Sequence, residues 1–90
     1  MANFYENLAP EDVTALDTLA RLLLELRDSR AQLLARHAAA DEAELLELIR
    51  SGAVGEHPAY EDYLGIRAIS LTREHIRDEL RDYMLTMGRA

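Results

Sequence analysis

The stretch PEDVTALDTLARLLLELRDSRAQLLARHAAA, residues 10–40, dominates the first half of this 90-residue chain. Its apolar residues recur every three or four positions, which is the period of an amphipathic α-helix. Pro10 suits the first position of a helix, because its missing N–H is not needed there, and no Gly or Pro follows it before residue 40. Glu11 and Asp12 place negative charge in the first turn, where the helix dipole favours it. The stretch therefore predicts one long helix over residues 10–40.

This helix is long for the size of the chain. At 1.5 Å per residue it would measure about 46 Å, whereas a compact chain of this length has a diameter near 31 Å, taken as about 2.6 times its radius of gyration. Its apolar face covers roughly 200° of the helical wheel, which is wider than the seam between two helices. We therefore expect either a break in the helix or a second subunit that covers the excess. The expected oligomer interface comprises Leu16, Leu19, Leu23, Leu26, Arg30, Leu33 and Leu34.

A second helix is predicted over residues 42–51. Asp41 is a good N-cap, and Glu44 stands three residues later, which is the spacing of a capping box. The three alanines before Asp41 are strong helix formers, however, so a single fused helix over residues 10–51 is an open alternative.

The C-terminal part is expected to form two helices, over residues 58–69 and 73–87. Its apolar residues fall into two sets on opposite sides of the helical wheel, and Thr72 is a suitable N-cap between them. The first set is Tyr60, Tyr63, Leu64, Ala68 and Leu71; the second is Ile76, Leu80, Tyr83, Met84 and Met87.

These elements predict a single all-α domain over residues 1–90, a small helical bundle completed by dimerisation. Residues 1–8 are interpreted as an N-terminal extension and residues 88–90 as a frayed end. A homodimer is favoured among homo-oligomers, and an unidentified protein partner is the second expectation.

The composition excludes several classes of function. Ten basic residues against 17 acidic ones give a formal charge of −7, which argues against a nucleic-acid partner. The absence of Cys excludes disulfides and thiol chemistry. The longest apolar run is Leu22–Leu24, and the first ten residues do not resemble a signal peptide, so neither a membrane partner nor export is expected. The cytoplasm is the expected compartment.

Each of the three histidines has an acidic residue four positions later, so each pair could share one helix face. A metal site of the carboxylate–histidine type is one interpretation, but the chain has no Glu-x-x-His motif. Local ion pairs are favoured, and neither a metal nor another cofactor is predicted. The weak metal candidates are His37, Asp41, His75 and Glu79.

Polar residues also interrupt the apolar face of the first helix. Arg30 and His37 could form a small anionic-ligand site; alternatively, both could extend to an interface edge, or pair with an acid from the helix predicted over residues 58–69 or from a second subunit. The second interpretation is favoured. Near the C-terminus, Arg73, Arg77 and Arg81 run beside three acidic residues, which indicates a solvated, ion-paired face rather than a phosphate-binding stripe.

Four residues are candidates for a partner surface, because Tyr and Met are common in adaptable binding surfaces as well as at core edges. They are Tyr60, Tyr63, Tyr83 and Met84.

The sequence thus favours a small acidic interaction or accessory protein that self-associates through its first helix and has no catalytic residues. One alternative is a ligand-binding or metal-binding protein, or a small enzyme, that uses Arg30 and His37. The other is an acidic inhibitor or nucleic-acid mimic of a basic partner, suggested by the dense acids of residues 41–47.

Overall fold

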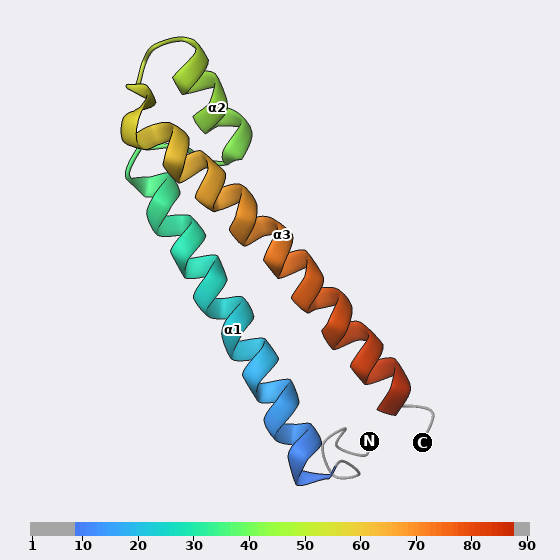
Figure 1. The fold of residues 1–90 in the computed structure, drawn as a ribbon. Helices are drawn as coiled ribbons and strands as arrows, with labels where there is room; N and C mark the ends of the chain where they lie inside the picture. Colours follow the sequence, from blue (N-terminus) through green and yellow to red (C-terminus); the bar gives the residue numbers. More distant parts are fainter. Residues whose placement is uncertain (1–8, 88–90) are drawn as a thin grey trace.

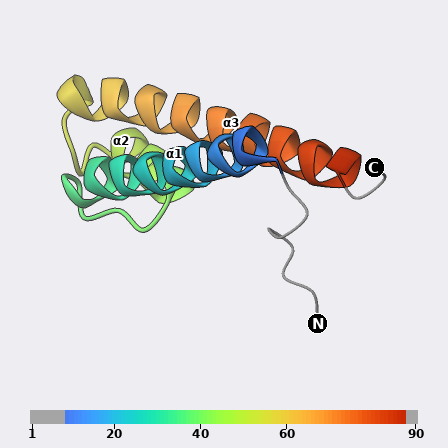
Figure 2. The same ribbon diagram turned by 90° about the horizontal axis from the view of Figure 1, so that it is seen from below.

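The computed structural model describes residues 9–87, which form three helices: α1 (Pro10–Ala35), α2 (Glu42–Arg50) and α3 (Glu56–Met87). α1 and α3 run antiparallel and side by side as a long hairpin, and α2 packs at the end of the hairpin remote from Pro10 and Met87 (Figure 1). The view from below shows the same two helices side by side (Figure 2). The predicted all-α class is confirmed. No described helix is long and apolar enough to cross a membrane.

The molecule is a rod rather than a ball, with principal extents of 55 × 22 × 18 Å. The chain is therefore not the compact ball for which a helix over residues 10–40 would be too long. α1, about 39 Å long at 1.5 Å per residue, lies against α3, which is itself longer. The length of α1 alone consequently does not require a second subunit.

α1 ends five residues earlier than predicted, and the fused helix over residues 10–51 is wrong. The Leu34 carbonyl accepts hydrogen bonds from the backbone N–H groups of both His37 and Ala39, each at 3.1 Å. Ending the helix with these two hydrogen bonds requires a residue in the left-handed backbone conformation, and Ala38 adopts it with a φ of 51°. Helix propensity favoured continuation through the alanines, but the tertiary packing of Ala39 against the core outweighs it.

The predicted cap of the second helix is confirmed. Asp41 has an extended backbone, and its side chain accepts a hydrogen bond from the Glu44 N–H at 2.8 Å. α2 ends at Arg50, one residue before the predicted boundary.

The predicted break between two C-terminal helices is wrong. α3 is continuous past Thr72, whose hydroxyl donates to the Ala68 carbonyl at 2.9 Å instead of capping a new helix. The only non-helical residue within α3 is His57, so the regular helix starts at Pro58 as predicted.

The seam between the long helices explains this continuity. Buried and half-buried residues recur at alternating spacings of three and four on both helices, as in an antiparallel coiled coil. On α3 two of the seam positions carry charged residues, Asp62 and Arg73, and Ser70 is half-buried beside the seam, so a helical wheel of apolar residues alone placed the buried face wrongly. The seam residues of α1 are Asp12, Leu16, Leu19, Leu23, Leu26, Arg30 and Leu33, continued by His37 in the segment after α1; those of α3 are Ala59, Asp62, Ile66, Ile69, Arg73, Ile76, Leu80 and Tyr83.

The core is concentrated where α2 covers the hairpin. Leu45 of α2 and Ile66 of α3 are fully buried, and together with Leu34 and Ala59 they form one cluster. Farther along the hairpin, Leu16 is buried without any contribution from α2. We call the end covered by α2 the closed end, and the end that contains Pro10 and Met87 the open end.

Candidate interaction surface

At the closed end, Asp62 of α3 holds the segment that follows α1. The Nε2 atom of His37 lies 2.8 Å from one carboxylate oxygen of Asp62, and the guanidinium of Arg36 lies 3.4 Å from the other. The side chains of His37 and Asp62 are both about nine-tenths buried. The acid partner expected for His37 is therefore present on α3.

Glu42, the first residue of α2, ties all three helices together. Its Oε1 atom accepts hydrogen bonds from the Nε of Arg30 on α1 at 3.1 Å and from the hydroxyl of Ser70 on α3 at 2.5 Å. Arg30 is thus paired with an acid, as the favoured interpretation expected, although the acid comes from α2. Both contacts fix the position at which α2 begins on the hairpin.

The weak metal candidates do not come together. The carboxylate that contacts His37 belongs to Asp62 and not to Asp41, and His75 and Glu79 are exposed on α3. Within residues 9–87, no group of three or more His, Cys, Asp or Glu residues is arranged to hold a metal ion. The remaining histidine, His57, contacts Glu61 at 2.5 Å in an exposed pair four residues apart.

At the open end, the Tyr83 hydroxyl donates a hydrogen bond to the Asp12 carboxylate and so links the start of α1 to the end of α3. This hydrogen bond raises the pKa of the Tyr83 phenol above its ordinary value of 10.0, because ionisation would lose the bond and place a second negative charge beside Asp12.

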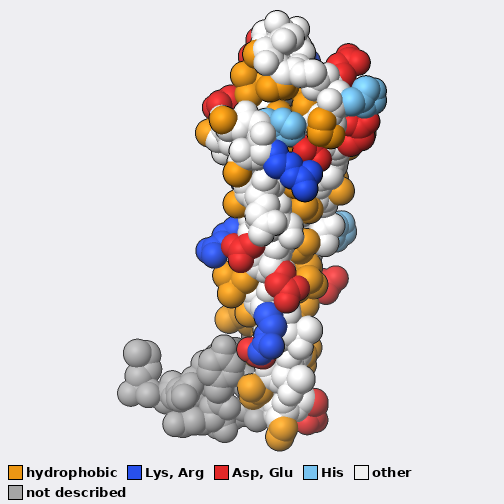
Figure 3. Space-filling view, turned by 90° about the vertical axis from the view of Figure 1, so that its left-hand side faces the viewer, with side chains coloured by type: hydrophobic (Ala, Val, Ile, Leu, Met, Phe, Trp, Pro, Cys, Tyr) orange, Lys and Arg blue, Asp and Glu red, His pale blue; other side chains and the backbone are white. Residues whose placement is uncertain are grey.

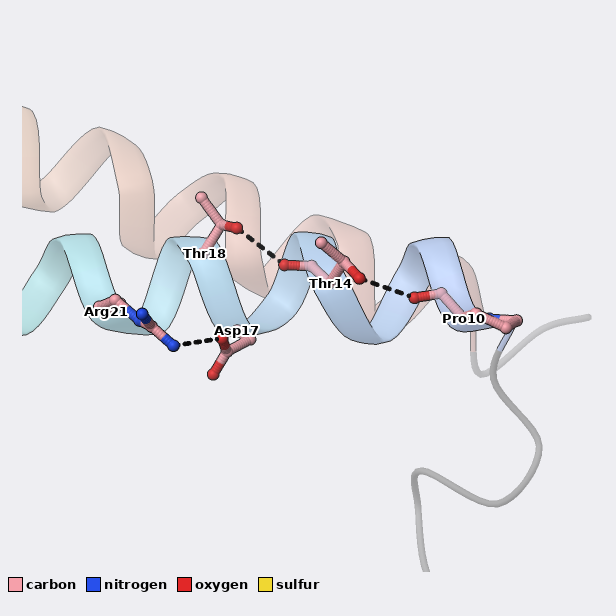
Figure 4. A network of polar contacts seen from close by, with 5 residues as sticks. All are labelled: Pro10, Thr14, Asp17, Thr18 and Arg21. Atoms are coloured by element: carbon pink, nitrogen blue, oxygen red, sulfur yellow. Dashed lines mark hydrogen bonds and ion pairs between the residues drawn. The ribbon is translucent and has the colours of Figure 1, made fainter.

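The outer side of α1 carries contacts that stay within the helix. The hydroxyls of Thr14 and Thr18 donate to the carbonyls of Pro10 and Thr14 at 3.0 and 2.9 Å, and Arg21 pairs with Asp17 at 2.9 Å (Figure 4). Seen from the α1 side, charged groups lie down the middle of this face and hydrophobic ones along its edges (Figure 3). These contacts stabilise α1 and bring no second element to the face.

Among residues 9–87, the face that α2 covers continues without a covering element toward the open end. Leu34 and Tyr63 mark this face at the closed end, since both belong to or pack against the core cluster. Each step of seven residues returns to nearly the same side of a helix, with a drift of about 20°. The steps from Leu34 reach Arg27, Ala20 and Val13, and the steps from Tyr63 reach Ser70, Arg77 and Met84.

These rows border a surface that we call the open groove, lined on α1 by Val13, Thr14, Leu16, Asp17 and Ala20, and on α3 by Arg77, Leu80, Arg81, Met84 and Leu85. Two hollows lie along it, one beside the α1 residues and one beside the α3 residues. Val13 and Met84 are 37% and 43% exposed, while Leu16, which lines the same hollow as Val13, is buried. α2 begins at Glu42, whose side chain contacts Arg30 and Ser70, and runs toward the closed end, so it does not cover the open groove (Figure 1).

A partly buried arginine, Arg73, lies at the boundary between the closed end and the open end. Arg73 is half-buried in the seam one turn beyond Ser70, and its Nε atom is fully buried with no hydrogen-bond partner among the described residues. Arg77, one turn farther along α3, is exposed at the edge of the open groove. The groove therefore combines apolar side chains with positive charge from α3.

A family model matches residues 4–87. The chain belongs to the uncharacterized protein MJ0235 family. Comparison of the chain with curated proteins and with solved structures gave no match. The family assignment thus adds no activity, ligand or partner to what the geometry of the chain offers.

In this member of the uncharacterized MJ0235 family, the residues predicted for the oligomer interface mostly face α3 of the same chain. Leu16 and Leu34 are buried, and the others are half-buried in the seam. The prediction that they contact a second subunit stays a prediction, and only Leu16 also lines the open groove. Sequence reasoning missed Val13 and Ala20 in this role, although steps of seven from Leu34 would have found them.

The predicted partner-surface residues separate into three environments. Tyr60 is 46% exposed and stacks on Tyr63, with ring centroids 6.2 Å apart, while Tyr63 packs against the core. Tyr83 bonds to Asp12 at the open end. Only Met84 lies in the open groove.

Proposed function

We propose that this protein is a small helical interaction or accessory protein that self-associates through the open groove, with α1 forming one wall of the contact. The observation that supports the proposal is that α2 covers only half of the face formed jointly by α1 and α3. The uncovered half carries the exposed side chains of Val13 and Met84, and Leu16 beside Val13 is buried. The proposal assigns the protein no catalytic activity.

The size of the open groove suits a modest dimer. The part of α1 that α2 leaves uncovered, from Pro10 to the Arg30–Glu42 contact, is about 30 Å long at 1.5 Å per residue, and the molecule is 22 Å across in its second dimension. Two such faces together would cover on the order of 1,300 Å², near the lower limit of stable, specific interfaces. We expect a dissociation constant in the micromolar range, because the favourable free energy of an interface of this size exceeds the entropic cost of association only slightly.

The polar residues of the closed end do not favour a ligand site of their own. Arg30, His37, Glu42 and Asp62 contact one another across the three helices, and each contact serves to join helices. The open groove is therefore the surface on which the protein's function is proposed to depend.

The test is the molar mass in solution, measured by light scattering and by sedimentation over a concentration range that extends well above micromolar. The wild-type chain is expected to dimerise. Ala20→Glu and Met84→Glu are expected to remain monomeric, because each places a carboxylate in the middle of the apolar contact.

Leu71→Glu is the matched control. Leu71 is 55% exposed and lies about 200° around α3 from the seam residue Arg73, so it faces away from α1. This variant should dimerise like the wild type. A wild-type chain that stays monomeric throughout, or a Leu71→Glu variant that is as monomeric as Ala20→Glu, would overturn the proposal.

A further inference from the structure

We infer that the second copy binds antiparallel, with α1 against the partner's α1, the two α2 helices at opposite ends, and Glu74 of each copy paired with Arg77 of the other. This inference rests on the proposed self-association and specifies its geometry. It follows from three features of the described residues, namely the position of α2, the length of the open groove and the charges along α3.

The position of α2 excludes a dimer with both α2 helices at the same end. α2 stands on the shared face of α1 and α3, and a helix with its side chains is about 10 Å thick. Two copies aligned in the same direction would place α2 against α2 and hold their open grooves about 20 Å apart. Turning one copy end over end moves each α2 past the end of its partner, so that the two open grooves can touch.

The length of the open groove fixes where the two-fold axis crosses α1. The part of α1 that α2 leaves uncovered starts at Pro10 and ends at Arg30, where the Glu42 side chain of α2 makes its contact. The midpoint between these residues is Ala20. With Ala20 on the axis, the Pro10 end of one copy reaches the start of its partner's α2 and goes no farther. The small side chain of Ala20 also allows close approach of the two α1 helices.

The same axis crosses α3 near Ile76. Tyr83 lies level with Asp12, to which it donates a hydrogen bond, and the seam residue Ile66 lies level with Arg30 in the order of seam residues along the two helices. Ala20 comes eight residues after Asp12, so its level on the antiparallel α3 is eight residues before Tyr83, just before Ile76. Residues on either side of this point therefore face each other across the antiparallel α3 pair.

Charges on either side of this point are complementary. Glu74 precedes the axis and Arg77 follows it, and both share a helix face with Ser70, as residues three or four positions apart do. Both side chains are exposed, and the ion pairs among the described residues include neither of them. An antiparallel partner brings its Glu74 within one helical turn of Arg77, and symmetry makes this contact twice.

Mixing two charge variants tests this arrangement. Glu74→Arg alone puts only arginines across the axis, and Arg77→Glu alone puts only glutamates there, so each should dimerise about tenfold more weakly than the wild type. An equimolar mixture of the two should form a heterodimer more readily than either forms a homodimer, because both cross-axis pairs are then opposite in charge. A heterodimer no tighter than the homodimers would overturn the inference.

Oxidative cross-linking provides a second measurement. The chain contains no cysteine, so Ala20→Cys introduces a single thiol at the predicted axis, where it should form an intermolecular disulfide within the range of Cα separations that such bonds require. Leu71→Cys is the control and should not cross-link efficiently, because it faces away from the contact. Equal cross-linking of the two variants would contradict the antiparallel geometry.

The self-association and its antiparallel geometry can be disproved separately. If the wild type dimerises and Ala20→Glu prevents it, but the charge mixture and the Ala20→Cys cross-link both fail, the self-association stands and the antiparallel geometry is wrong. If the wild type is monomeric at every concentration, both are wrong.

Discussion

The two ends of the hairpin use the same pair of helices with the same spacing of seam residues, yet they differ in what completes them. At the closed end α2 supplies Leu45 to the core and Glu42 to both long helices. At the open end no third helix is present among the described residues, and Val13 and Met84 remain exposed. The comparison teaches that a helical pair buries only one stripe of each helix, and that a third element decides whether the adjoining face is core or surface.

The largest difference between the ends should appear when a core leucine is truncated. Leu45→Ala removes a fully buried side chain at the closed end and should lower the free energy of unfolding by about 2–5 kcal/mol. Met84→Ala, the matched change at the open end, should cost well under 1 kcal/mol in a monomer. Urea unfolding followed by circular dichroism at low protein concentration measures both. Equal losses would mean that the open groove is as well packed as the closed end.

A smaller effect is expected from the polar contact at the start of α2. Glu42→Ala removes the acceptor shared by Arg30 and Ser70, and should cost about 1–2 kcal/mol, since the side chains of Arg30 and Glu42 are only partly buried. Hydrogen exchange should show faster opening of α2 amides, with the amides of α1 near Val13 unchanged. Uniform acceleration along the whole of α1 would contradict the local role assigned to Glu42.

The smallest effect concerns the Asp12–Tyr83 bond at the open end. Because the pKa of Tyr83 is raised in the folded chain, its contribution to stability is complete below pH 10.0 and is lost as the pH rises through the folded-state pKa. The stability of the wild type should therefore fall more steeply above this pH than that of Tyr83→Phe. Free energies of unfolding of the two proteins across the alkaline range give the comparison, and parallel curves would show that the bond does not form in solution.

The sequence predicted those parts of the fold that depend on local chemistry. Pro10 at the start of α1 and Asp41 at the start of α2 were both located, because caps and first-turn residues act through their neighbours in the chain. The all-α class followed from the apolar period in the same way.

The errors arose where tertiary contacts reverse a local preference. Asp62, Ser70 and Arg73 occupy the inner side of α3, and Asp62 and Ser70 are satisfied by His37 and Glu42, which come from distant parts of the chain. A helical wheel of apolar residues alone does not show such polar partners. The sequence pattern therefore predicted two helices where the structure has one continuous helix. The open groove was missed for a related reason, since only the position of α2 shows which half of the face is left uncovered.

The left-handed Ala38 that closes α1 has a practical consequence. A residue with a side chain pays about 1 kcal/mol or more in this conformation, and glycine does not. Ala38→Gly should therefore stabilise the chain by up to about 1 kcal/mol, although the greater freedom of glycine in the unfolded state offsets part of the gain. Ala38 lies at the closed end, far from the groove. The Ala38→Gly protein is thus a more stable parent, in which destabilising groove variants can remain folded and be compared.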